Sequence, residues 1–137
     1  MLMVIDTSAI IAVLLNEATA ARVAQAIETG SPRLISAANL PEASIVIESR
    51  KDEAGGRELD LFFYRTAIEV VAVDQDQAEI ARLGWRRFGE GRHPAGLNYG
   101  NCFAYAVAKT GRLPLLYQGN DFRQTDIADV SLPLASV

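Results

Sequence analysis

Five side chains with oxygen ligands follow predicted strands or begin predicted helices. Asp6 comes directly after an apolar N-terminal run, Asp121 follows a short apolar segment, and Glu42 and Asn101 lie near predicted helix starts. In a parallel sheet, the carboxyl ends of the strands share one rim with the helix starts that follow them. Carboxylate and amide oxygens suit Mg²⁺ or Mn²⁺, an ion that can activate water and stabilise phosphoryl charge. The predicted oxygen cluster comprises Asp6, Glu42, Asn101, Asn120 and Asp121.

Each of these residues also has an ordinary structural explanation. An Asp between a strand and a helix is commonly an N-cap, and Glu42 in a first turn complements the helix dipole. Asn101 is of a type that caps helices, and the pair Asn120-Asp121 is of a type that forms Asx turns. Asp6 is the strongest exception, because a charge placed directly after a buried strand is costly without a partner.

The elements that must position these residues alternate between strand and helix. Predicted strands cover residues 1–5, 33–35, 68–73 and 114–117, with a final edge strand at 130–132. Predicted helices cover residues 7–15, 17–28, 36–51, 57–67, 74–88 and 98–109, and the glycine pair 55–56 breaks the chain between the third and the fourth. This alternation predicts an α/β fold with a mostly parallel sheet of four to five strands and helices on both faces.

Composition excludes several classes of protein. The chain has 137 residues, half of them hydrophobic, which predicts one domain spanning residues 1–137 with a core of its own. One cysteine and one histidine exclude a disulfide, a Cys-pair zinc site and a two-His metal site. The longest apolar run, Ala9 to Leu15, is too short to span a bilayer, and the N-terminus lacks the basic start of a secretory signal. We therefore expect a cytoplasmic protein without a membrane segment.

A set of sequence blocks points to a known family. The blocks are MVIDTSAI (3–10), SAANLPEASIVIE (36–48), GGRELD (55–60), GRHPAGLNYG (91–100), NCFAYA (101–106), LLYQGNDF (115–122) and TDI (125–127). In this order and spacing they resemble the PIN-domain ribonucleases, and specifically the VapC toxins of toxin–antitoxin pairs. Asp-Thr-Ser alone is a weak signal, whereas the whole set is specific and spans nearly the entire chain.

The resemblance implies a three-layer PIN-like fold and a Mg²⁺-dependent endoribonuclease that cuts tRNA or rRNA. It also implies a homodimer that is neutralised by a cognate VapB-type antitoxin. By position, Asp6 is then a direct metal ligand, Glu42 is the second carboxylate, and residue 101 is the third acid of the site. The remaining implied groups are Asn120 and Asp121 as the fourth polar position, and the hydroxyls of Thr7 and Ser8 as holders of the site or of a phosphate.

The sequence departs from the family pattern at position 101, where the family normally has Asp and this chain has Asn101. An amide keeps an oxygen acceptor but loses the negative charge. We therefore expect Asn101 to remain a catalytic and metal-binding position with weakened metal affinity and reduced activity. Mn²⁺ is an alternative cofactor to Mg²⁺.

Basic side chains must offset the acidic cluster before RNA can bind. Candidates for phosphate contacts are Arg92 and His93 in the loop, with Arg82, Arg86 and Arg87 on the preceding predicted helix. A solvated helix face explains the three helical arginines equally well, and a structural role is as good an explanation for His93. A second basic group comprises Arg50, Lys51 and Arg57.

Two other classes of function stay open on sequence grounds. One is a catalytically impaired PIN-fold module that binds antitoxin or RNA without cleaving it, with Asn101 marking the lost chemistry. The other is a receiver-like domain or small phosphatase that uses Asp6 as phosphoacceptor. The receiver class expects a lysine after a late strand, where this chain has Gln118.

Overall fold

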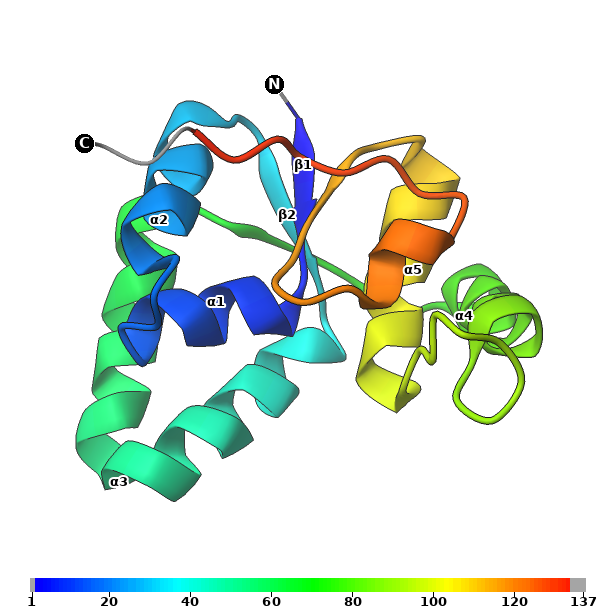
Figure 1. Ribbon diagram of the computed structural model, residues 1–137. Coiled ribbons are helices and arrows are strands. Elements are labelled where there is room, and N and C mark those ends of the chain that lie inside the picture. Colours follow the sequence, from blue (N-terminus) through cyan, green and yellow to red (C-terminus); the bar gives the residue numbers. More distant parts are fainter. Residues whose placement is uncertain (1, 134–137) are drawn as a thin grey trace.

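The computed structural model describes residues 2–133 and has a parallel sheet between two groups of helices (Figure 1). The strand order is β3-β2-β1-β4, and every pairing is parallel. The strands are β1 (Met3–Ile5), β2 (Arg33–Ser36), β3 (Glu69–Val71) and β4 (Leu115–Leu116). Strand β1 is interior and its three residues are all buried, which explains its unbroken apolar sequence.

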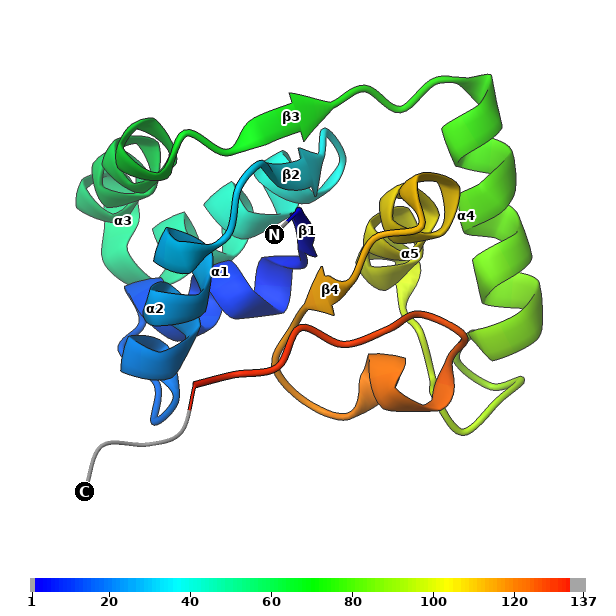
Figure 2. The same ribbon diagram turned by 90° about the horizontal axis from the view of Figure 1, so that it is seen from above.

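Helices cover both faces of this sheet, as Figure 2 shows from above. One layer contains α1 (Thr7–Leu14), α2 (Ala20–Thr29) and α3 (Asn39–Thr66), and the other contains α4 (Gln75–Phe88) and α5 (Tyr99–Gly111). Successive side chains of β1 point to opposite faces of the sheet. Ile5 packs in the core beneath α1 and α2, whereas Val4 packs beneath α5. The predicted three-layer α/β architecture is confirmed.

The predicted division of residues 36–67 into two helical segments is correct, but the break lies at Asp52 and not at Gly55-Gly56. Helix α3 continues through both glycines and is kinked earlier, at Asp52, which has φ 54° and ψ −154°. Gly55 is instead a site of close packing, because an added Cβ would lie 2.6 Å from Lys51 Cβ and 2.8 Å from Ile47 Cγ2. The glycine pair therefore reports crowding within a helix rather than the end of one.

The predicted edge strand at 130–132 is also wrong. Next to β4 the chain forms a single parallel bridge, between Leu115 and Asp129, and the backbone N–H of Val130 donates to the Leu115 carbonyl. Because β4 is only two residues long, it offers too short an edge for a longer ladder. A 3-10 helix, η1 (Asp121–Gln124), lies between β4 and this bridge. Of the initial predicted strand, Met1 lies outside the described residues.

Helix α4 is attached to the rest of the molecule mainly through α5 (Figure 2). The two helices approach closely at Gly84, where an added Cβ would lie 2.6 Å from the Tyr105 ring. A salt-bridged Asp126, which accepts from Lys109 and Arg87, ties the C-terminal segment to both helices. Within residues 2–133, none of the helices has the length and apolarity needed to cross a membrane.

Candidate active site

Asp6 joins the end of β1 to the start of α1 and is almost completely buried, with 1% of its surface exposed. Its Oδ2 accepts hydrogen bonds from the backbone N–H of Ser8 at 3.1 Å and from the Ser8 hydroxyl at 2.6 Å. The other oxygen, Oδ1, is buried and has no hydrogen-bond partner among residues 2–133. The N-cap explanation is therefore correct for one oxygen of Asp6 and leaves the other unexplained.

The surroundings of Asp6 raise its pKa to about 6. Burial is the main cause, because a carboxylate inside the protein loses its hydration. The bonds from Ser8 lower the pKa, the nearby Glu42 charge raises it, and the nearby Asn101 side chain lowers it. Asp6, Glu42 and Asn101 are therefore brought together, as the shared rim predicted.

Glu42 lies in the first turn of α3 and is held by two donors. The Thr7 hydroxyl and the Asn39 amide both donate to its Oε1, the second at 3.1 Å. Asn39, fully buried, also donates to the Gly100 carbonyl at 2.9 Å and so connects the starts of α3 and α5. A larger residue at Gly100 would displace the Glu42 carboxylate, because an added Cβ would stand 1.9 Å from Glu42 Oε2.

Asn101 takes part in a capping box at the start of α5. Its Oδ1 accepts from the Asn98 backbone N–H at 3.0 Å, and the Asn98 side chain accepts from the Asn101 N–H at 2.9 Å. Since Oδ1 faces the backbone, the group that Asn101 presents to Asp6 is its amide NH₂. The cap explanation and the site explanation therefore both apply to Asn101, and its amide NH₂ stands where an Asp would place a second oxygen.

The loop after β4 reaches the cluster through the backbone rather than through its acidic side chain. The Gln118 N–H donates to Ser8 Oγ at 3.0 Å, so Ser8 connects this loop with Asp6. Asn120 and Asp121 are both exposed at the start of η1. The carboxylate that acts on the Asp6 pKa is Glu42, not Asp121.

Arg92 and His93 lie in the loop between α4 and α5, away from these contacts. The Arg92 guanidinium sits 4.7 Å from the centre of the Trp85 ring, and its Nε donates to the Arg86 carbonyl. His93 Nδ1 accepts from the Ala95 N–H at 3.0 Å, and its ring packs edge-on against Phe88. The structural explanation of His93 accounts for these contacts.

Sequence reasoning missed Asn39 and Gly100 as parts of the site. Asn39 stands three residues before Glu42, the spacing at which helical side chains meet, so the pair could have been found from sequence. Gly100 gave no such signal, because its role depends on a carboxylate from a different helix.

The donor set was tested for its fit to a divalent ion. Among residues 2–133, no three Asp, Glu, His or Cys side chains gather in a metal-binding group. Two carboxylates, of Asp6 and Glu42, are nevertheless adjacent, and the partnerless Asp6 Oδ1 is a buried oxygen that a cation would satisfy. The arrangement therefore fits a hard cation held by two carboxylates, with Asn101 in the position of a third ligand.

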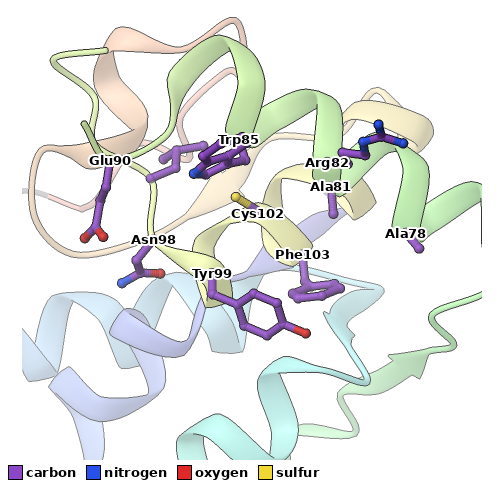
Figure 3. Close-up of a pocket in the computed structure, with 10 residues that line it drawn as sticks. Ala78, Ala81, Arg82, Trp85, Glu90, Asn98, Tyr99, Cys102 and Phe103 are labelled. Carbon is purple, nitrogen blue, oxygen red and sulfur yellow. The ribbon is translucent and has the colours of Figure 1, made fainter. Parts of the chain in front are cut away.

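A pocket of about 500 Å³ opens beside this cluster, between α4 and α5 (Figure 3). It is lined by Ala78, Ala81, Arg82, Trp85, Glu90, Leu97, Asn98, Tyr99, Cys102 and Phe103. Burial raises the pKa of the Cys102 thiol to about 11, with a smaller contribution from the Glu90 charge. The thiol is therefore neutral and lines the pocket as a small apolar group.

Comparisons with known proteins agree with this architecture. The PIN domain family matches residues 3–128. Ribonuclease VapC30 of Mycobacterium tuberculosis is 53% identical over 131 residues, covering 96% of this chain and 100% of that protein. Mycobacterium tuberculosis VapC20, a sarcin-ricin loop cleaving toxin, has a TM-score of 0.79 at 17% identity, covering 96% of this chain and 99% of that one. A toxin–antitoxin complex from Klebsiella pneumoniae has a TM-score of 0.66 at 21% identity, covering 90% and 92%.

The chain belongs to the PIN domain family, whose match spans most of its length. Within that family its high-identity relatives are VapC ribonucleases, matched over almost the whole chain. The resemblance noted from the sequence blocks is thereby confirmed.

Proposed function

We propose that the protein is a Mg²⁺-dependent endoribonuclease toxin of the VapBC type, which hydrolyses phosphodiester bonds of cellular RNA, with tRNA or rRNA as targets. The observation that supports it most is the partnerless, buried Oδ1 of Asp6 beside the Glu42 carboxylate. A buried carboxylate oxygen without a donor is costly unless a ligand satisfies it. The ribonuclease names of the relatives point to the same activity.

Asp6 and Glu42 would hold the cation, and Asn101 would stand at a third position. When bound, Mg²⁺ or Mn²⁺ supplies Lewis-acid stabilisation of the phosphate charge and lowers the pKa of water. The protein's own part is to fix the two carboxylates. Ser8 orients Asp6 through two hydrogen bonds, and Thr7 and Asn39 orient Glu42 from the other side.

Glu42 is the better placed of the two carboxylates to accept a proton from the attacking water. Its Oε1 is engaged by Thr7 and Asn39, whereas Oε2 faces Gly100 without a side chain in between. Unlike Asp6, Glu42 is only partly buried, so one oxygen remains accessible to a substrate. A carboxylate held in one orientation is an effective general base because it needs no reorganisation.

Phosphate binding is assigned to groups around the cluster. The net charge of −4 disfavours RNA, so local cations must supply the attraction. Arg92 is exposed and is proposed to contact a phosphate, with His93 beside it in the same loop. Asn120, exposed after β4, completes the proposed phosphate contacts, and Asp121 beside it is proposed as a catalytic carboxylate. The hydroxyls of Thr7 and Ser8 hold the site by donating to Glu42 and Asp6.

Asn101 is proposed to lower the activity. The amide NH₂ that faces Asp6 repels a cation, and the missing charge weakens the attraction for one. The alternative, a catalytically impaired module that binds antitoxin or RNA without cleaving, depends on the same residue. Metal-dependent RNA cleavage by the native chain would support the attenuated nuclease, and its absence would support the binding module.

Two protein partners and a compartment complete the proposal. A VapB-type antitoxin is supported by the Klebsiella pneumoniae neighbour, which is itself a toxin–antitoxin complex. For a homodimer, α3 offers exposed apolar side chains: Tyr64 is 85% and Leu61 45% exposed, while Phe62 and Phe63 pack against the core. A cytoplasmic location follows from the proposed RNA substrate.

The test is cleavage of total cellular RNA by the purified chain, by Asn101→Asp and by Asp6→Ala, each with Mg²⁺ and with EDTA. We expect weak cleavage by the native chain, stronger cleavage by Asn101→Asp, and none by Asp6→Ala or with EDTA. Circular dichroism shows whether all three chains are folded. If folded Asn101→Asp cuts no RNA with Mg²⁺ or Mn²⁺, the nuclease proposal fails and the binding-module alternative gains.

A further inference from the structure

The pocket between α4 and α5 exists because small side chains meet at the seam of the two helices. Ala78 and Ala81 come from α4 and Cys102 from α5, where larger residues would close the space (Figure 3). Its volume of about 500 Å³ lies within the range of pockets for small ligands. None of the proposed catalytic carboxylates lines it, so the proposed chemistry leaves its purpose open.

Aromatic rings at the pocket keep much of their surface in water. Tyr99 is 80% exposed and Trp85 is 43% exposed, while Phe103 packs edge-on against Tyr99 at 4.9 Å between ring centres. The Trp85 indole is held by the Arg92 guanidinium, and Gly89 leaves it room, since an added Cβ would lie 2.3 Å from Trp85 Cδ1. Exposed rings held in this way are stacking platforms for nucleic acid bases.

Polar groups stand at the two ends of the pocket. Glu90 and Asn98 lie together at one end, and Arg82 lies at the other (Figure 3). The Glu90 carboxylate can only accept hydrogen bonds, whereas Asn98 has its Oδ1 engaged in capping α5 and offers its NH₂ as a donor. An acceptor next to a donor matches the Watson–Crick edge of guanine, whose N1–H and N2–H donate and whose O6 accepts.

The pocket adjoins the catalytic cluster along α5. Asn98 and Tyr99 line the pocket, and Asn101 follows within one helical turn, about 5 Å along the helix axis. Tyr99 also borders a second, apolar depression that Glu42 and Gly100 line. A nucleotide with its base in the pocket would therefore have its backbone beside Glu42, with Arg82 available to a flanking phosphate.

We propose that this pocket binds an unpaired guanine of the RNA substrate, adjacent to the phosphate that is cut. Trp85 and Tyr99 stack on the base, Glu90 accepts from N1–H and N2–H, and Asn98 donates to O6. The identity of the ligand as part of a substrate rests on the proposed nuclease function. Recognition of guanine by the pocket does not rest on that function, because binding is measured without metal and without RNA cleavage.

Trp85 is the only tryptophan of the chain, so its fluorescence reports directly on the pocket. The experiment titrates the full chain in EDTA with guanosine, inosine and adenosine 5′-monophosphates. We expect saturable quenching by the guanosine nucleotide, with affinity at least about fivefold higher than for the other two. Inosine lacks only the 2-amino group, so this difference isolates one of the two bonds to Glu90.

Glu90→Gln is the specific variant, and Glu53→Gln, an exposed change on α3, is its matched control. Glu90→Gln should abolish the preference for guanosine over inosine while Glu53→Gln keeps it. Tyr99→Ala should weaken binding of all three nucleotides by about fivefold or more, because stacking does not distinguish bases. Equal affinities for the three nucleotides, or a preference that survives Glu90→Gln, would overturn the proposal.

The outcomes also separate this proposal from the nuclease function. Guanosine binding without RNA cleavage would support the guanine pocket and overturn the proposed nuclease function. RNA cleavage without nucleotide binding would support the nuclease function and overturn the guanine pocket. If no nucleotide quenches Trp85 and Trp85→Ala converts a dimer into a monomer in light scattering, the pocket is covered by a second copy of the chain and the guanine proposal is overturned.

Discussion

Strands β1 and β4 are neighbours that end at the same edge of one parallel sheet, yet the carboxylates that follow them differ. Asp6, after β1, is covered by the starts of α3 and α5 and keeps one oxygen without a partner. Asp121, after β4, begins an exposed 3-10 helix. Asp6 directly follows the last residue of β1, whereas Asp121 comes five residues after β4 ends at Leu116, and only Asp6 is buried away from water.

The difference teaches that a place at the strand end is necessary but not sufficient for a shifted carboxylate. Burial raises the pKa of Asp6 to about 6, whereas Asp121 lies exposed to solvent. The covering residues, Asn39 and Gly100, therefore contribute to the site without touching Asp6. In this view Asp6 and Glu42 form the functional centre and Asp121 assists from outside.

The largest expected effect separates Glu42 from Asp121 in RNA cleavage. Glu42→Gln should reduce the cleavage rate by at least about hundredfold, whereas Asp121→Asn should reduce it by about tenfold or less. Both changes preserve side-chain shape, so the folded structure should survive in each. Equal losses for the two variants would contradict the contrast between the buried and the exposed carboxylate.

The next effect concerns stability and follows from the raised pKa of Asp6. Because the folded state holds the Asp6 proton more tightly than the unfolded chain, this contribution is fully present below pH 3.8 and is lost as the pH rises through about 6. At pH 7.5 the buried charge thus costs about 3 kcal/mol, and at pH 5 about half of that.

Asp6→Asn should remove this cost. In EDTA, urea unfolding should therefore show a larger gain in the free energy of unfolding for the variant at pH 7.5 than at pH 5. Asp121→Asn serves as the control for the loss of an exposed carboxylate. A gain for Asp6→Asn that is the same at both pH values would show that the charge is not the cause.

A smaller effect is expected at Gly100, which separates the position of Glu42 from its charge. The Cβ of Gly100→Ala would collide with the Glu42 carboxylate and turn it away from its donors. We expect about a tenfold loss of cleavage with a destabilisation of about 1–3 kcal/mol. Gly56→Ala, within α3, is a control for glycine replacement, because an added Cβ there would meet the Glu48 side chain, outside the proposed site. Unchanged cleavage in Gly100→Ala would mean that the Glu42 position does not matter.

The sequence predicted the parts of the fold whose signals are local. Strand β1 was recognisable from its apolar residues, and α4 from Asp74, which caps it as predicted. The break between the two segments of α3 was predicted but placed three residues too late, at Gly55-Gly56 and not at Asp52, because a glycine looks the same in sequence whether it ends a helix or relieves crowding inside one. The strand at 130–132 was mispredicted because its existence depended on the length of its neighbour β4.

The candidate site was predictable to a similar extent. The convergence of Asp6, Glu42 and Asn101 followed from the shared rim of a parallel sheet. The direction of the Asn101 amide could not be predicted from the shared rim, because it is set by the capping box with Asn98. Nor could the sequence separate Asp121 from Asp6, because their difference in burial comes from helices far along the chain.

The central claim is that Asp6 and Glu42 form a cation site that Asn101 weakens. Calorimetric titration of Mg²⁺ into the native chain, Asn101→Asp and Asp6→Asn tests it most directly, without RNA or turnover. The account predicts binding about tenfold or more tighter in Asn101→Asp than in the native chain, and none in Asp6→Asn. Identical Mg²⁺ affinities in the three folded chains would contradict it.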